Sequence, residues 1–296
     1  MTTNKRTAQR ECTFGEKYLE INGKSLFVTI KGQGDPIIFI HGGPGGSLEY
    51  FLPYMEPLAE SYQVILYDQA GCGKSERDKL DHYSLEDEIN NLELIRTALN
   101  LDKVTLFGES WGSILALSYA AKYPFNIHKL ILTAAIGLSS IDYQTFKKTL
   151  LQKMGSYKKM KLGYYSLVAA LGGNVSEKVN ILMDPYYVYS VETLTKKKEI
   201  QNNKRALNKI SRDIEKEYNL LPSIDQIENL PVLIAQGSHD ILSTAFIEKN
   251  VMKHLKNAEL VEVKESGHWT ILEQPEQIRK LTKSFLEARE TVSLRN

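Results

Sequence analysis

A serine between two glycines is the residue with the clearest chemical potential in this sequence. Ser110 lies in Gly108-Glu109-Ser110-Trp111-Gly112, which has the G-x-S-x-G spacing of a nucleophile elbow. The apolar residues 104–107 before it predict a buried strand, and the small and apolar residues 113–121 after it predict a helix. Glycine on both sides leaves room for a sharp turn between them. The pattern therefore predicts a serine hydroxyl held up at a helix N-terminus, where the helix dipole favours a developing anion.

A serine hydroxyl is a weak nucleophile unless a base takes its proton, and two further motifs supply the partners. Asp240 follows the apolar residues 231–235, and His268 follows the predicted strand 260–263. The chain order serine, acid, histidine is one of the orders in which such triads occur. We expect His268 to act as base and then as acid, and Asp240 to fix the imidazole tautomer and stabilise the imidazolium.

The segments that must position these side chains alternate between strand and helix patterns. The continuous apolar run at 36–40 is typical of a strand buried on both faces of a parallel sheet, and residues 63–67 and 129–135 predict two further strands. Ser84 followed by acidic residues predicts a helix that ends near Asn100. Such alternation predicts an α/β fold in which functional loops lie beyond the carboxyl ends of the strands.

Two further elements complete this core. Asn22-Gly23 between two apolar runs predicts an antiparallel hairpin near the start of the chain. An amphipathic helix is expected from Pro275 to about Ala288.

Residues 141–220 break the strand-helix alternation. They contain no strand-like apolar run, 15 basic against 8 acidic residues, and eight of the 16 tyrosines. Gly172-Gly173 and Pro185 divide the segment into pieces, so we expect three or more inserted helices. Two interpretations stay open: a solvated charged surface with ordinary packing of the rings, or a tyrosine-rich roof over a pocket.

Composition limits the classes of partner. The net charge is +1, from 37 basic and 36 acidic residues, so no global field favours nucleic acid or a membrane. Two cysteines, Cys12 and Cys72, are too few for a disulfide framework, and no Cys/His spacing suggests a metal or other cofactor. The N-terminal ten residues lack the apolar core of a signal peptide, and no apolar run approaches about 18 residues. These features favour a cytoplasmic protein acting on a small molecule or short peptide, with no membrane partner.

Five motifs carry a family resemblance. They are His41-Gly42-Gly43-Pro44-Gly45-Gly46, Asp68-Gln69-Ala70-Gly71-Cys72-Gly73-Lys74-Ser75, Gly108-Glu109-Ser110-Trp111-Gly112-Ser113, Gly237-Ser238-His239-Asp240 and Gly267-His268. With these motifs the sequence resembles the α/β-hydrolase superfamily and, within it, the proline iminopeptidase family of serine aminopeptidases. The resemblance implies a mostly parallel eight-stranded sheet flanked by helices, with residues 1–138 and 226–296 as the core domain and 139–225 as a helical cap. It also implies that the backbone N–H groups of Gly43 and Trp111 form the oxyanion hole.

The sequence departs from this family in two places. Family members often carry arginine where this chain has Ala70, and their caps usually hold a Trp-x-x-Trp-Glu segment whose glutamate binds the substrate amine. The nearest stretch here, residues 187–192, has no tryptophan but ends in Glu192. Glu192 is therefore the first candidate for the amine site, with Glu199, Glu215 and Glu217 as alternatives.

Three functional hypotheses follow. The first is an aminopeptidase that releases an N-terminal residue, often proline, from short peptides. The second is an esterase, lactonase or amidase that uses the same triad on an uncharged small molecule. The third is a non-enzymatic receptor of the same fold, which the presence of Ser110, Asp240 and His268 argues against, since a binding module does not need all three.

Overall fold

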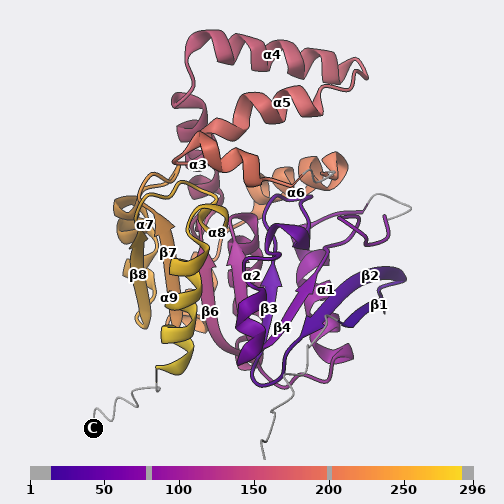
Figure 1. The fold of residues 1–296 in the computed structure, drawn as a ribbon, viewed down its shortest axis with the longest axis vertical. Helices are drawn as coiled ribbons and strands as arrows, with labels where there is room; N and C mark the ends of the chain where they lie inside the picture. The colour runs from indigo at the N-terminus through magenta and orange to yellow at the C-terminus, as the bar shows by residue number, and fades with distance from the viewer. Residues whose placement is uncertain (1–14, 78–81, 199–201, 289–296) are drawn as a thin grey trace, which may run out of the picture.

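The computed structural model describes residues 15–77, 82–198 and 202–288 (Figure 1). The expectations for the N-terminal ten residues and for Cys12 concern residues outside these ranges. The described strands form one eight-stranded sheet. They are β1 (Gly15–Ile21), β2 (Lys24–Lys31), β3 (Pro36–Ile40), β4 (Gln63–Tyr67), β5 (Val104–Glu109), β6 (Ile127–Thr133), β7 (Val232–Gly237) and β8 (Ala258–Val263).

The strand order is β1-β2-β4-β3-β5-β6-β7-β8. Strands β1 and β2 pair antiparallel with their neighbours, and all other pairings are parallel. The hairpin between β1 and β2 turns at Asn22 (φ 52°) and Gly23 (φ 70°), a left-handed pair that asparagine and glycine tolerate well. The predicted mostly parallel eight-stranded sheet is therefore confirmed.

The central strands are buried on both faces because helices cover the sheet on each side (Figure 1). In β3, the fully buried Ile37 and Phe39 pack in one core, while the equally buried Ile38 and Ile40 pack in the other. One strand thus supplies both layers, since successive side chains point to opposite faces. This explains why its sequence is a continuous apolar run.

The helices divide into two groups. Five helices of the described chain pack around the sheet. Four others are inserted between β6 and β7, within the segment expected to be helical. The first five are α1 (Leu85–Ala98), α2 (Trp111–Lys122), α7 (Thr244–Asn250), α8 (Thr270–Glu273) and α9 (Pro275–Glu287), and the four inserted helices are α3 (Ser140–Gln152), α4 (Ser156–Ala170), α5 (Ser176–Met183) and α6 (Lys204–Glu217). The inserted helices gather at one end of the molecule, with α4 and α5 outermost (Figure 1).

Across the described ranges, none of the helices combines the length and apolarity that crossing a bilayer requires. The described cysteine, Cys72, is a free and buried thiol.

Candidate active site

Ser110 lies at the turn between β5 and α2, with left-handed backbone angles of φ 53° and ψ −116°. These angles are costly for a residue other than glycine, so the surrounding contacts must hold them. A Cβ on Gly108 would lie 2.3 Å from the carbonyl oxygen of Gly112, and a Cβ on Gly112 would lie 2.1 Å from that of Ile40. Strand and helix can approach this closely only where both residues are glycine.

The three predicted triad residues meet beyond the ends of three strands. His268 Nε2 lies 2.8 Å from Ser110 Oγ, and His268 Nδ1 lies 2.7 Å from Asp240 Oδ1. Asp240 and His268 are buried, while Ser110 is half-buried and so remains accessible. This arrangement can transfer the serine proton to the imidazole while the carboxylate holds the other ring nitrogen.

The carboxylate of Asp240 is itself fixed by neighbouring donors. Gln236 Nε2 donates to Oδ2 (3.0 Å), and the amide of Ile241 donates to Oδ1. Lys153, from the end of α3, donates to the Asp240 backbone carbonyl (3.0 Å). Partial burial lowers the pKa of Lys153, an effect that nearby Asp240 opposes. Asp240 therefore has a fixed orientation toward His268.

Aromatic side chains from the inserted segment cover His268. The ring of Phe146 in α3 lies 5.0 Å from the imidazole, and that of Tyr187 lies 5.6 Å from it. Tyr187 also stacks on Trp269 (5.5 Å), and its carbonyl accepts from the His268 amide (2.7 Å). Burial raises the pKa of Tyr187, so its phenol stays neutral. Of the eight tyrosines in the inserted segment, Tyr187 is thus part of an aromatic roof at the site.

Glu273 in α8 connects the inserted segment to the loop before His268 through hydrogen bonds. Its Oε1 accepts from the amides of Tyr189 (2.7 Å) and Ser190 (3.0 Å), and its Oε2 accepts from the amide of Gly267 (2.6 Å). Sequence reasoning missed this residue, because nothing in its local pattern distinguishes it from an ordinary surface glutamate.

The glycine-rich loop after β3 lies against the elbow. A Cβ on Gly42 would be 3.6 Å from Ser110 Cβ, which shows how close the two segments are. Gly43 has φ 127°, a conformation that favours glycine. In the described loops and turns, the backbone hydrogen bonds include none donated by Gly43 or Trp111. The role of these two N–H groups as an oxyanion hole therefore remains a prediction.

Gln69 joins this loop to the nucleophile elbow. Its Nε2 donates to the carbonyl of His41 (2.9 Å), and its Oε1 accepts from the indole of Trp111 (2.8 Å). His41 is fully buried, and its Nε2 accepts a hydrogen bond from the backbone N–H of Gln69 (3.2 Å). Burial lowers the pKa of His41, so this histidine stays neutral and structural. The motif after β4 thus contains a positioning residue that sequence reasoning did not single out.

Glu109, the residue before the nucleophile, is a buried carboxyl inside the elbow itself. The phenol of Tyr50 donates to its Oε1 at 2.5 Å. Its Oε2 lies 3.8 Å from the position of a Cβ on Gly42, the same position that Ser110 Cβ approaches. Among the described residues Oε2 has no hydrogen-bond partner, and Glu109 as a whole is only 3% exposed. Burial raises the pKa of Glu109 well above its usual range.

The glutamates proposed from the sequence for an amine site lie elsewhere. Glu192 is exposed, on a short 3-10 helix (Val191–Lys196), and none of the contacts of the described residues joins it to the triad. Glu215 forms an ion pair with Lys147, Glu217 is exposed, and Glu199 lies outside the described residues. The role of Glu192 therefore remains a prediction, and Glu109 is the glutamate that the fold brings next to Ser110.

Glu88 in α1 is another buried carboxyl, and it contacts the loop that follows β4. Its Oε1 accepts from the amide of Ala70 (3.3 Å), and its Oε2 is enclosed without a partner in the described structure. Burial raises the pKa of Glu88 from 4.5 to about 7. Proline iminopeptidases often have arginine where this chain has Ala70, and alanine supplies no charge to offset the burial.

We expect Glu88→Gln to stabilise the protein at high pH and to change it little at low pH. The unfolded chain loses the Glu88 proton at lower pH than the folded chain, so wild-type stability falls as pH rises from 4.5 to about 7. The shift corresponds to about 3 kcal/mol of unfolding free energy. Urea unfolding at about pH 5 and about pH 8 measures the effect, with the exposed Glu259→Gln as control. Parallel pH dependence in wild type and E88Q would contradict it.

Comparison with known proteins identifies the family of this chain. A family model described as alpha/beta hydrolase fold matches residues 35–275. The chain is 28% identical over 294 residues to a proline iminopeptidase of Saccharolobus solfataricus, covering 92% of each chain. It is 25% identical over 299 residues to a cis-3-alkyl-4-alkyloxetan-2-one decarboxylase of Shewanella oneidensis, covering 95% of this chain and 91% of the relative.

Solved structures show the same fold. The crystal structure of a proline iminopeptidase from Mycobacterium smegmatis superposes with a TM-score of 0.69 at 18% identity, covering 92% of this chain and 97% of that one. At this identity the likeness concerns the fold alone.

Proposed function

This chain belongs to the α/β-hydrolase fold family, and on that basis we propose that it is a serine hydrolase releasing an N-terminal residue, of proline type, from short peptides. The observation that carries the proposal is the relay from Ser110 Oγ through His268 to Asp240, with contacts of 2.8 and 2.7 Å. Similarity to proline iminopeptidases over nine-tenths of the chain supports the peptidase assignment.

The geometry indicates how the reaction proceeds. His268 Nε2 takes the hydroxyl proton as Ser110 Oγ attacks the carbonyl carbon of the substrate. The N–H groups of Gly43 and Trp111 stabilise the oxyanion, at the positive end of α2. His268 then protonates the leaving amine, which leaves an acyl-enzyme on Ser110. A water molecule, deprotonated by His268, hydrolyses this ester and restores the serine.

Recognition of a free amine requires a negative partner, because burying an unpaired ammonium is costly. We propose Glu109 for this role. Tyr50 holds one of its oxygens, and the other, which has no hydrogen-bond partner among the described residues, lies near Gly42 in the loop that contacts Ser110. An ammonium near Oε2 favours the ionised carboxyl, so the Glu109 proton leaves as the amine binds.

We expect Glu109→Gln to raise KM for aminoacyl amides by about tenfold to a hundredfold, as expected for a lost charge-assisted hydrogen bond. Hydrolysis of a neutral acyl ester should change little, because glutamine can still accept from Tyr50 and leaves the triad in place. Steady-state kinetics on both substrate types separates the two effects.

Glu192→Gln is the matched comparison, since it tests the glutamate suggested by family resemblance. A KM effect in E192Q with none in E109Q would transfer the amine site to Glu192. Equal loss on ester and amide substrates in E109Q would show that Glu109 acts on the triad instead of on the amine.

The aromatic roof favours a second candidate function. Phe146 and Tyr187 present apolar rings against His268, a lining suited to uncharged substrates. An esterase, lactonase or amidase could use the same triad. A hydrolysis panel of prolyl, alanyl and other aminoacyl amides against short acyl esters decides between the two. Turnover of esters alone by the wild type would exclude the peptidase.

A further inference from the structure

Helix α4 carries a row of large apolar side chains that face solvent. Their positions repeat at intervals of three and four residues, so they lie on one face of the helix and continue past its end. The exposed fractions are 73% for Tyr157, 72% for Met160, 62% for Tyr164, 59% for Leu167 and 81% for Leu171. We call these five residues the α4 stripe. Contiguous apolar surface of this kind marks an interaction site.

A different face of α4 attaches the helix to the rest of the molecule. Tyr165 is buried, Leu162 and Val168 are half-buried, and Lys158 lies over the ring of Tyr186 (5.0 Å). Because these contacts fix the rotation of the helix, α4 cannot bury its stripe while keeping them.

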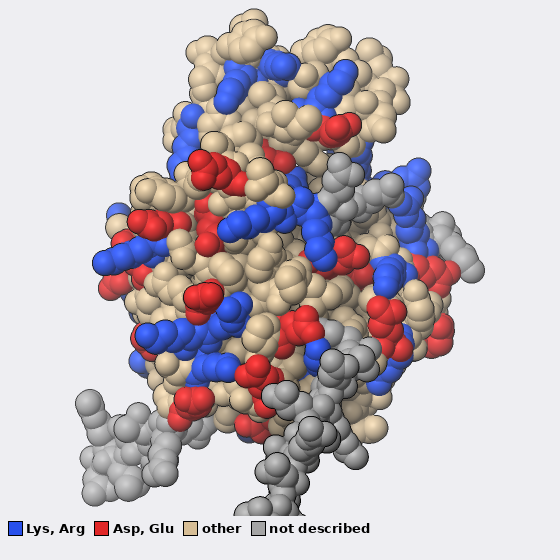
Figure 2. All heavy atoms as spheres, viewed as in Figure 1, with Lys and Arg blue, Asp and Glu red and all other residues tan. Residues whose placement is uncertain are grey.

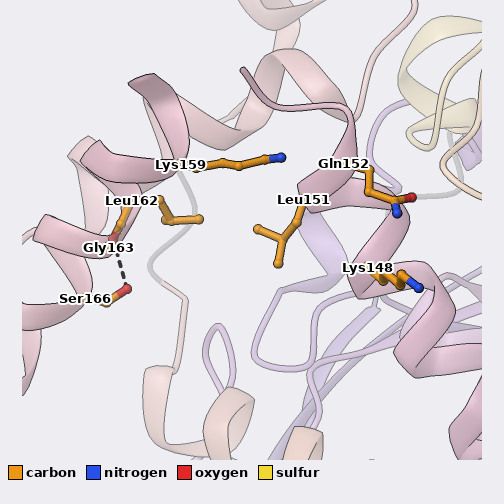
Figure 3. A pocket seen from close by; sticks show the side chains of 7 residues that line it. All are labelled: Lys148, Leu151, Gln152, Lys159, Leu162, Gly163 and Ser166. Atoms are coloured by element: carbon orange, nitrogen blue, oxygen red, sulfur yellow. Dashed lines mark hydrogen bonds between the residues drawn. The ribbon is translucent and has the colours of Figure 1, made fainter. Parts of the chain in front are cut away.

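A third side of α4 borders a groove of about 750 Å³ toward α3 (Figure 3). Leu151 and Leu162 extend between the two helices, and Lys148 and Lys159 lie at its edges (Figure 3). The groove therefore adds apolar and basic surface next to the face of α4 that carries Tyr165. The α4 stripe lies on another face of the helix and is exposed to solvent.

The same segment is strongly basic. Residues 147–183 contain seven lysines and one glutamate, and α4 itself has three exposed lysines and no acidic residue. Figure 2 shows this contrast: basic side chains predominate over the outermost helices, whereas both signs mix over the sheet. The +1 net charge of the whole chain conceals this local surplus.

We propose that the α4 stripe docks on an anionic membrane surface. A helix with an apolar row and lysines lies in the plane of the bilayer interface, with its apolar side chains at the acyl boundary and its cations near lipid phosphates. Tyr157 and Tyr164 suit this boundary, because an aromatic ring with a polar tip prefers the interface. A second copy of this chain is the alternative occupant, and the oligomeric state of the lipid-free protein distinguishes it from a membrane surface.

The inference is independent of the proposed hydrolysis and replaces the expectation of no membrane partner, which rested on whole-chain charge. It describes attachment to one leaflet by an outermost helix and involves no span. Docking through α4 would hold the inserted helices, and the site that they cover, close to the lipid surface.

Cosedimentation with vesicles tests the proposal on the full chain. Wild type should pellet with vesicles of phosphatidylcholine mixed with phosphatidylserine, remain in solution with phosphatidylcholine alone, and be released by high salt. Two variants should lose binding: Tyr164→Ser/Leu167→Ser, which interrupts the stripe, and Lys158→Gln/Lys159→Gln/Lys161→Gln. The lysine variant should weaken binding by about 100-fold, at about fivefold per lysine.

Matched controls lie on the sheet domain. Phe125→Ser removes an apolar side chain that is 85% exposed, and Lys249→Gln/Lys253→Gln/Lys264→Gln removes three exposed lysines. Both should bind like wild type, and ester hydrolysis by every variant should match wild type and so report an intact fold.

Three results would overturn the proposal. They are a wild type that binds neither vesicle, stripe variants that bind normally, and a wild-type dimer in lipid-free light scattering that the stripe variant converts to monomer. The last result would identify the α4 stripe as an interface between copies.

Discussion

Replacing Ser110 by alanine is expected to reduce hydrolysis by about 10⁶-fold while leaving the fold intact. Its hydroxyl contacts His268 Nε2 and packs against no core cluster, so alanine removes the nucleophile without opening a cavity. Purified S110A assayed against the preferred amide or ester measures the loss, with thermal unfolding to check that the chain is folded.

Ser118→Ala provides the matched control. Ser118 is buried in α2, the helix that begins directly after Ser110, and its hydroxyl has no hydrogen-bond partner in the described structure. Its removal should leave turnover unchanged. A fluorophosphonate probe should label wild type and S118A but not S110A. Label on another serine, or retained activity in S110A, would show that the nucleophile is misassigned.

Replacing Asp240 by asparagine is expected to lower kcat by about 10⁴-fold, as in other triads. The carboxylate accepts from His268 Nδ1 at 2.7 Å in a buried site, so it selects the tautomer in which Nε2 can take the serine proton. The amide of asparagine can donate to Nδ1 and so favour the opposite tautomer. Steady-state kcat of D240N measures the effect.

The double variant provides a further check on this unit. If Asp240 acts through His268, then D240N combined with His268→Ala should be no slower than H268A alone, because effects within one catalytic unit are not additive. Asp213→Asn is the control, since Asp213 accepts from the Leu85 amide at the start of α1 and is not one of the triad residues. If the fold-decrease in kcat of the double variant equalled the product of the two single decreases, Asp240 would not act through His268.

Much of the fold follows from local sequence. The run 36–40 is apolar throughout, and the run 63–67 is apolar after Gln63. Both form central strands because parallel strands covered on two faces need apolar side chains on both. Asn22-Gly23 predicted the hairpin because few other pairs adopt two successive left-handed conformations.

An insertion of three or more helices was predicted, but not the orientation of these helices. Gly172-Gly173 and Pro185 follow the ends of α4 and α5, as breakers do. However, the spacing of Tyr157, Met160 and Tyr164 in sequence resembles that of residues packed in a core. The structure shows these three side chains exposed. The buried Tyr165 lies on the face of α4 that packs against the molecule, so the face with Tyr157, Met160 and Tyr164 turns toward solvent.

The sequence by itself determined the chemistry: a strained serine turn, and an acid and a histidine that each follow a strand. Parallel strands end at one edge of a sheet, so the three residues converge once the strands pair, and local pattern suffices to predict this. Only the tertiary structure decided that the Glu109 carboxyl is buried against Tyr50 and that Glu192 is exposed. It also decided that Gln69 and Glu273 fasten the loops around the triad and that the α4 stripe faces solvent. The physical reason is that these outcomes depend on contacts between segments far apart in the chain, which set the direction of each side chain and which no local periodicity encodes.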